Sequence, residues 1–72
     1  MKITLPQKWT DHLVHLPESG MGYQRVDVFF EDGFIQRDCV VLNAETIELP
    51  ESCEGRTIKD IRLHRKDHPT TP

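Results

Sequence analysis

The sequence predicts an α+β fold, in which a short N-terminal helix packs on a strongly bent, mostly antiparallel four-stranded sheet. Two segments rich in β-branched and aromatic residues flank Asp32-Gly33, a dipeptide typical of hairpin turns. Apolar residues recur every three or four positions between residues 5 and 16, which is the period of a helix. The length of 72 residues allows one domain with a small core.

The N-terminal helix is predicted over Pro6–Leu16. Pro6 suits the first helical turn, where its missing N–H would have no acceptor, and Pro17 ends the helix. A helix of about 11 residues is marginally stable alone, so its apolar side must cover a sheet. That side is formed by Leu5, Trp9, Leu13 and Leu16.

The loop after the helix, Glu18–Gly22, places two glycines around Met21. Such a segment favours positive φ angles and a sharp change of direction. A Gly-x-Gly can also form an anion-binding nest of backbone N–H groups. Here a strand follows instead of a helix and no third glycine is present, so the sequence favours a hinge over a phosphate site.

The hairpin joins strands predicted at Gln24–Glu31 and Phe34–Leu42, and two registers fit it. In the first, a two-residue turn at Asp32-Gly33 pairs Val26 with Cys39. One strand face then holds a single polar residue, Arg37, and otherwise only apolar side chains. These are Val26, Val28, Phe30, Ile35, Cys39 and Val41.

The second register has a three-residue turn with a bulge at Gly33 and pairs Asp27 with Arg37, but it moves Gln36 and Asp38 onto the apolar face. A cross-strand ion pair contributes roughly 0.2–1 kcal/mol, whereas burying an unpaired polar group costs about 1–3 kcal/mol. The sequence therefore favours the two-residue turn.

Two short elements are predicted after the hairpin. Asn43-Ala44 is a turn that leads into a short strand at Glu45–Leu49, which Pro50 ends. The loop Glu51–Gly55 can hold one helical turn, which Gly55 would end.

The last strand is predicted over Thr57–Arg65. Ile58 is out of phase with Ile61 and Leu63, which indicates an irregular start or a bulge. Residues 1–65 are thus expected to form a single small domain. Residues 66–72 are polar, contain two prolines and are predicted to be a disordered tail.

Several stretches resemble a group of small bacterial proteins of unknown function. They are Leu16-Pro17-Glu18-Ser19-Gly20-Met21-Gly22-Tyr23-Gln24, Val26-Asp27-Val28 and Val40-Val41-Leu42-Asn43. The resemblance implies a compact independent domain and no particular activity.

The chain is also similar to Sm-like and related SH3-like small barrels, which begin with a helix followed by a bent sheet with an Asp-Gly hairpin. The matching apolar positions are Val26, Val28, Phe30, Ile35, Val40 and Ile47–Leu49. This resemblance implies that the sheet closes into a small SH3-like barrel. Asp38 stands near a position where that family usually has glycine, and the last strands contain no Arg-Gly motif, so RNA binding is not implied.

The composition, with 36% hydrophobic and 29% charged residues, is that of an ordinary soluble protein without a membrane span. The N-terminal residues lack the apolar region of a secretory signal. Two cysteines are too few for a disulfide framework, so a cytoplasmic protein with reduced thiols is expected. Cys39 is expected to be buried and Cys53 to be exposed.

The net charge of −3 conceals an asymmetry along the chain. Residues 27–54 contain eight acidic residues and one arginine, a net charge of −7, whereas residues 56–68 contain five basic and two acidic residues, a net charge of +3. Self-complementary surface charge is the simplest explanation. A basic strip that meets a partner is the alternative.

No motif for catalysis, cofactor binding or metal binding is present. Ser19 and Ser52 lie in turn sequences without a nucleophile elbow. The pairs His12/His15 and His64/His68 have no accompanying Cys-x₂-Cys, so solvated histidines are expected. We therefore expect neither an enzyme nor a cofactor or metal site.

Protein association is the function that explains most of the sequence. In the favoured register, the hairpin face turned away from the helix carries too much apolar surface for a solvated face. The expected contact residues, for a protein partner or a homodimer, are Phe29, Phe34, Val40 and Leu42. The alternative is a nucleic-acid-binding small barrel with phosphate contacts from Arg56, Lys59, Arg62, Arg65 and Lys66.

Overall fold

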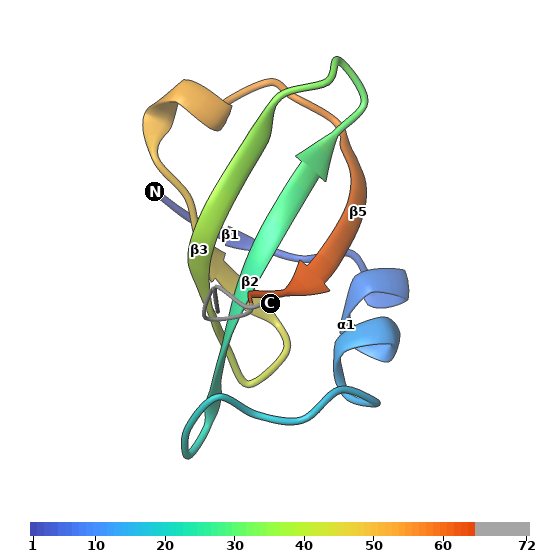
Figure 1. Cartoon of the computed structure of the whole chain (residues 1–72), viewed down its shortest axis with the longest axis vertical. Helices are drawn as coiled ribbons and strands as arrows, with labels where there is room; N and C mark the ends of the chain where they lie inside the picture. Colours follow the sequence, from blue (N-terminus) through green and yellow to red (C-terminus); the bar gives the residue numbers. More distant parts are fainter. Residues whose placement is uncertain (65–72) are drawn as a thin grey trace, which may run out of the picture.

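The computed structural model describes residues 1–64, which form one α-helix, one 3₁₀ turn and five strands (Figure 1). In chain order these are β1 Lys2–Thr4, α1 Gln7–Leu13, β2 Tyr23–Phe30, β3 Ile35–Leu42, β4 Thr46–Glu48, η1 Glu51–Cys53 and β5 Ile58–Leu63. The α+β class agrees with the prediction. No helix in the described part of the chain is long and apolar enough to cross a membrane. The predicted tail, residues 66–72, lies outside the described residues.

All five strands form one antiparallel sheet with the order β1-β4-β3-β2-β5. The described strands do not close into a barrel, and β1 and β5 are the two edges. The count of five strands corrects the predicted four. The additional strand is β1, whose three residues are too few to show an alternating pattern. Because β1 pairs with β4, the strand predicted at Glu45–Leu49 lies inside the sheet.

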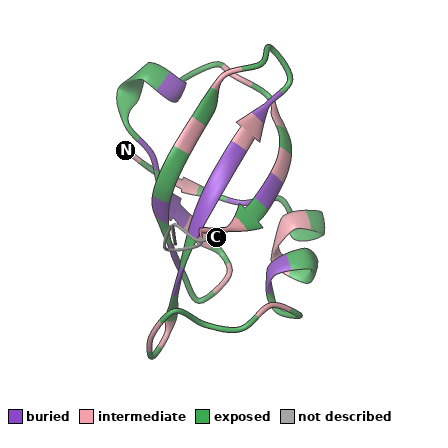
Figure 2. Cartoon of the chain, viewed as in Figure 1, coloured by how far each residue is buried: buried purple, intermediate pink, exposed green. Residues whose placement is uncertain are grey.

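The core lies on one face of the sheet and is built mostly from strand residues. Buried positions are concentrated on β2 and the neighbouring parts of β3, β4 and β5 (Figure 2). From the helix, Leu13 is fully buried and Trp9 packs against the core, as its apolar stripe predicts. The buried apolar residues are Leu5, Leu13, Val26, Val28, Phe30, Cys39, Val41, Ile47, Leu49, Cys53 and Ile61.

Helix α1 ends at Leu13, three residues before the predicted end. In a longer helix the Leu13 carbonyl would accept a hydrogen bond from residue 17, but Pro17 has no N–H to donate. The side chain of Gln24 supplies donors here. Its Nε2 donates to the carbonyl oxygens of Leu13, Leu16 and Pro17 at 3.0, 3.2 and 3.3 Å.

The hairpin combines both predicted registers, one on each side of a bulge. Next to the turn it follows the three-residue register, because Phe30 N donates to Phe34 O at 2.9 Å. Gly33 has a φ of +92°, the left-handed conformation that this kind of turn requires at its last residue. The preferred two-residue turn at Asp32-Gly33 is therefore wrong.

On the side of the bulge away from the turn, the strands follow the register of the two-residue turn, with Val26 opposite Cys39. The extra residue is Asp38, which has a φ of 60° and whose N–H donates to Asp27 Oδ1 at 2.9 Å. A bulge shifts the pairing by one residue, and a one-residue shift exchanges the two faces of a strand. Each half of the hairpin can thus direct its apolar residues to the core without burying Asp38.

Strand β5 begins with the predicted irregularity. Phe29 lies opposite Asp60 and Phe30 opposite Ile58, so Lys59 is the extra residue between the two pairs. Ile58 therefore returns to the core side and packs against it.

The outer edge of β5 is covered at Ile61, in the middle of the strand. Its carbonyl oxygen accepts a hydrogen bond from His12 Nε2 of helix α1 at 2.9 Å. Its N–H donates to Asp60 Oδ1 at 2.8 Å. Since both backbone groups are occupied, this edge is protected from pairing with a strand of another molecule.

Both cysteines are free and buried. This agrees with the prediction for Cys39 and corrects it for Cys53, which is 2% exposed because η1 turns its side chain into the core. Burial, with a smaller contribution from Cys53, raises the pKa of the Cys39 thiol to about 11. The Cys39 thiol therefore stays protonated near neutral pH and is a poor nucleophile.

Candidate functional site

The side of β2 and β3 that is turned away from the core, called the outer face below, exposes several large apolar side chains. Its directly opposite pairs are Tyr23–Leu42, Arg25–Val40 and Phe29–Ile35. The exposed fractions are 36% for Tyr23, 43% for Ile35, 38% for Val40 and 41% for Leu42. Phe29 is half-buried there, with the Arg62 guanidinium carbon 5.3 Å from its ring centroid. Three of the four predicted contact residues, Phe29, Val40 and Leu42, thus lie on one face.

Phe34 is not on the outer face, which corrects the fourth predicted contact residue. Its ring lies 6.0 Å from that of Phe30 on the core side, and the Arg56 guanidinium carbon covers it at 4.1 Å. The cause is the three-residue turn, which exchanges the faces of the first residues of β3 relative to the two-residue turn. Ile35 takes the place predicted for Phe34 on the outer face.

A belt of charged residues crosses the outer face and separates its apolar side chains into two groups. We call these five residues, Arg25, Asp27, Arg37, Asp38 and His64, the polar belt. On one side of the belt lie Tyr23, Val40 and Leu42, and on the other lie Phe29 and Ile35. The exposed apolar surface is therefore not one continuous patch.

Asp27 is the central group of the polar belt and is only 7% exposed. Its Oδ1 accepts hydrogen bonds from the Asp38 N–H at 2.9 Å and from His64 Nδ1 at 2.8 Å. Its Oδ2 lies 3.5 Å from a guanidinium nitrogen of Arg37. A carboxylate at a buried position needs such donors, because an unpaired buried charge is strongly destabilising.

The second pair of the polar belt joins Arg25 to Asp38. Two guanidinium nitrogens of Arg25 donate to the two carboxylate oxygens of Asp38, and the Nε–Oδ1 distance is 2.6 Å. The hydrogen bond from Arg25 lowers the pKa of Asp38, and the same contact raises the pKa of Arg25. The sequence alone did not predict this pair, since it depends on the position of the bulge at Asp38.

The basic residues proposed for nucleic-acid binding do not form a free cationic strip in the described part of the chain. Arg56 pairs with Asp32, whose pKa is lowered first by the Phe34 N–H and then by Arg56. Arg62 pairs with Asp60 at 2.9 Å and lowers the pKa of that carboxyl. Lys59 is exposed and makes no ion pair with residues 1–64. Arg65 and Lys66 lie outside the described residues.

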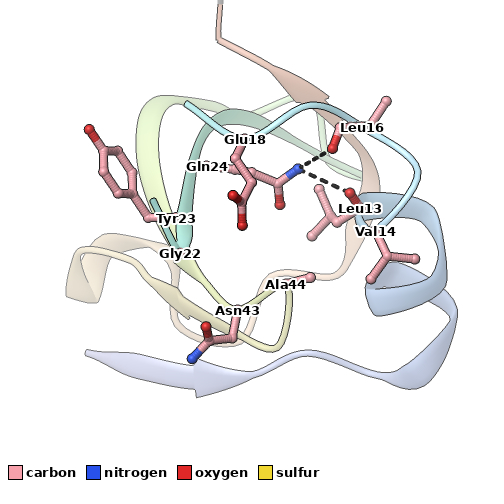
Figure 3. A pocket seen from close by; sticks show the side chains of 9 residues that line it. All are labelled: Leu13, Val14, Leu16, Glu18, Gly22, Tyr23, Gln24, Asn43 and Ala44. Carbon is pink, nitrogen blue, oxygen red and sulfur yellow. Dashed lines mark hydrogen bonds between the residues drawn. The ribbon is translucent and has the colours of Figure 1, made fainter. Parts of the chain in front are cut away.

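A surface pocket of about 320 Å³ lies where the end of α1, the following loop and the turn at Asn43-Ala44 meet (Figure 3). Its lining residues are Leu13, Val14, Leu16, Glu18, Gly22, Tyr23, Gln24, Asn43 and Ala44. This pocket is not predicted from the sequence. One signal could have indicated it, because Gln24 is a polar residue in phase with the core positions Val26, Val28 and Phe30.

A smaller pocket of about 190 Å³ is lined by Ser19, Tyr23, Arg25 and His64. Ser19 Oγ accepts a hydrogen bond from Arg25 N at 2.8 Å, and the Asp27–His64 pair lies beside it. No hydrogen bond joins Ser19 to His64 among the described residues. The arrangement thus lacks the serine–histidine contact of an activated nucleophile.

Metal binding has no candidate centre within residues 1–64, where no three His, Cys, Asp or Glu side chains are grouped to hold an ion. The two surfaces that remain as candidates are the outer face with its polar belt and the pocket beside Gln24. No protein-family model, no functionally characterised protein and no solved structure matches the chain.

Proposed function

We propose that the chain is a small non-enzymatic protein-interaction module that associates with a second copy of itself through the outer face. The observation that supports this most directly is the exposure of Tyr23, Ile35, Val40 and Leu42 on two neighbouring strands. Several large apolar side chains left exposed on one face of a sheet make that face a candidate contact surface.

The layout of the outer face suits a twofold interface. In such an interface each copy contributes the same patch, related to its partner by a rotation of 180°. An axis through the polar belt would place the Tyr23–Leu42 end of one copy on the Phe29–Ile35 end of the other. The charges of the belt are already paired within each chain, which reduces the free-energy cost of covering them.

The association is expected to be weak. The exposed apolar side chains of the outer face present about 300 Å² in total, divided into two groups by the polar belt, and even a continuous patch of this size is common on monomers. A standard stable complex buries about 800 Å² on each partner. We therefore expect a dissociation constant of about 10–100 μM.

Sedimentation velocity of the full chain over a hundredfold range of concentration tests the proposal. The sedimentation coefficient should rise with concentration, and Leu42→Glu should abolish the rise because it places a charge in the interface. Val14→Glu is the matched control, since Val14 is 60% exposed on the helix side of the molecule. If the wild-type chain unfolds cooperatively on heating, and is therefore folded, but sediments as a monomer at all concentrations, the homodimer is contradicted.

Nucleic-acid binding through Arg56, Lys59, Arg62, Arg65 and Lys66 is the second candidate. It is supported by Lys59, which the bulge in β5 leaves exposed, and it is weakened by the ion pairs of Arg56 and Arg62. Fluorescence anisotropy with a mixed pool of short RNAs at low salt distinguishes the two. Binding that Lys59→Glu weakens and Leu42→Glu leaves unchanged would favour this candidate over the homodimer.

We also propose that the sheet is an opened form of an SH3-like small barrel. Strand β5 pairs with β2, the first strand of the β2–β3–β4 meander. Helix α1 connects the two edges of the sheet, because it follows edge strand β1 and its His12 forms a hydrogen bond with Ile61 of edge strand β5. In the open form the N–H groups of Lys2 and Thr4 face away from β4, because Met1 and Leu5 make the bonds to that strand. Fast amide exchange at Lys2 and Thr4 is expected, and slow exchange would indicate a closed barrel.

A cytoplasmic location is proposed as well. Cys39 and Cys53 are both free and buried, as in proteins of a reducing compartment. A fluorescent fusion followed by cell fractionation tests it.

A further inference from the structure

We propose that the pocket at the end of α1 binds a primary ammonium group carried on a short alkyl chain, either a free amine or a lysine side chain. This proposal does not depend on the outer face or on self-association. It follows from the side chains that the pocket presents, which are hydrogen-bond acceptors in its middle and apolar groups on its wall.

The first step is the orientation of the Gln24 amide. Its nitrogen contacts the carbonyl oxygens of Leu13, Leu16 and Pro17. Carbonyl oxygens only accept hydrogen bonds, so the NH₂ group must face them and the amide oxygen must face the opposite way. Residue 24 is 3% exposed, and yet no group of residues 1–64 donates to its Oε1.

The second step is that this oxygen is open to the pocket. Every fully buried side-chain polar atom of the described residues has a hydrogen-bond partner, so an Oε1 without one must be accessible. Figure 3 shows the Gln24 amide oxygen and the Glu18 carboxylate both pointing into the space between α1 and the Asn43-Ala44 turn. Two acceptors directed into one small pocket suit a hydrogen-bond donor, and a carboxylate among them favours a cationic one.

The third step is the shape and the wall of the pocket. Val14 and Leu16, which are exposed and half-buried, form an apolar side against which the methylene groups of an alkyl chain can pack, and the fully buried Leu13 lies behind them. The volume of about 320 Å³ lies at the lower end of the range for ligand sites, so it suits one side chain or a small amine. No basic side chain lines the pocket among residues 1–64, and thus none competes for the two acceptors.

The experiment is a titration of the ¹⁵N-labelled full chain with n-butylammonium chloride, followed by two-dimensional NMR. Shifts should concentrate on Gly22, Gln24 and its side-chain NH₂, and Asn43, with a dissociation constant of about 1–10 mM for a ligand of so few atoms. n-Butanol, which has the same alkyl chain without the charge, and sodium chloride at equal ionic strength should not produce this pattern.

Two variants separate the pocket from general attraction to an acidic protein. Glu18→Gln should weaken butylammonium binding about tenfold, since it removes the charge-assisted hydrogen bond. Glu45→Gln, next to Ala44 but outside the pocket lining, removes the same charge and should leave the dissociation constant within twofold. Equal effects of the two variants, or shifts spread over the whole surface, would overturn the proposal, as would the absence of any saturable shift.

Two further ligands distinguish the sources of the ammonium group. Cadaverine represents a free amine, and a lysine blocked at both its amino and carboxyl groups represents the side chain of a partner protein. Tighter binding of the blocked lysine assigns the pocket to a protein partner, and tighter binding of cadaverine assigns it to a free amine. The Nε-acetylated form of the blocked lysine should not bind, and equal binding of this form would refute recognition of the charge.

Discussion

Replacing Gln24, the one polar residue on the core side of β2, by methionine should strongly destabilise the fold. Methionine has nearly the same size and keeps the apolar contacts, but it removes the amide that donates to Leu13, Leu16 and Pro17. The Leu13 carbonyl keeps the bond from the Leu16 N–H at 2.9 Å, so two carbonyls lose their donor.

The magnitude follows from the number of groups left without a partner. Each unsatisfied, partly buried carbonyl costs about 1–1.5 kcal/mol, so we expect a loss of about 2–3 kcal/mol in the free energy of unfolding. A chain of this length has a total stability of about 5 kcal/mol. Gln24→Met should therefore remove about half of it.

Urea unfolding followed by the fluorescence of Trp9, the one tryptophan, measures the effect. With a slope of about 1 kcal/mol per molar urea, the midpoint should fall by about 2–3 M. Gln36→Met is the matched control, because Gln36 is partly buried on neighbouring β3 and, within residues 1–64, its side chain accepts only a long contact from Cys53 Sγ at 3.9 Å. Equal midpoints for the two variants would refute the assigned role of the Gln24 amide.

Three further predictions concern the bulge, the turn and the thiols. Because Arg25 lowers the pKa of Asp38 below 3.8, ionised Asp38 stabilises the fold above that pH, and this contribution is lost as the pH falls through the lowered value. Asp38→Asn should therefore reduce the loss of stability on acidification, measured by circular dichroism between neutral pH and pH 2. An unchanged loss would contradict the Arg25–Asp38 pair. Gly33→Ala forces a side chain into a φ of +92° and should lower the free energy of unfolding by about 1 kcal/mol in urea titrations, whereas no loss would argue against the three-residue turn. Burial raises the pKa of Cys39 from 9.0 to about 11, so the unfolded chain ionises first and stability should fall as the pH rises from 9 towards 11, by at most about 3 kcal/mol. In a Cys53→Ala background, iodoacetamide at pH 8 should alkylate the Cys39 thiol only after unfolding, and rapid labelling of the folded chain would refute the burial.

The two proposed surfaces of the chain are adjacent but distinct. Tyr23 lines the pocket and also belongs to the outer face, where it lies opposite Leu42. Asn43 and Ala44 of the pocket follow Leu42 directly. A partner that covers this end of the outer face would therefore also reach the pocket, although each surface is tested by its own variants.

The sequence was sufficient for features that depend on neighbouring residues. The periodic spacing of Trp9 and Leu13 predicted the helix and its buried side, and the phase change at Ile58 predicted the bulge in β5. The turn at Asn43-Ala44 was also correct, and both residues have positive φ angles as a tight hairpin turn requires. These features arise from the local spacing and conformational preferences of a few residues.

The errors at the hairpin and at Cys53 share one cause, which is that the decisive contacts are not made between neighbouring residues of the sequence. A single register throughout the hairpin is the expectation from the sequence, whereas the Asp27 carboxylate stabilises a bulge at Asp38 that joins the two registers. This error placed Phe34 on the outer face. Cys53 was expected to be exposed, but η1 turns it into the core.

The sequence by itself thus determined the class of the fold, the hairpin and most of the core, because alternation and helical periodicity are properties of short segments. Only the tertiary structure decided which apolar residues remain on the outer face, since a bulge exchanges the faces of a strand and its position depends on contacts between strands. The pocket also required the tertiary structure. Gln24 can direct its amide oxygen outward only because the end of α1 lies next to β2 and occupies its nitrogen.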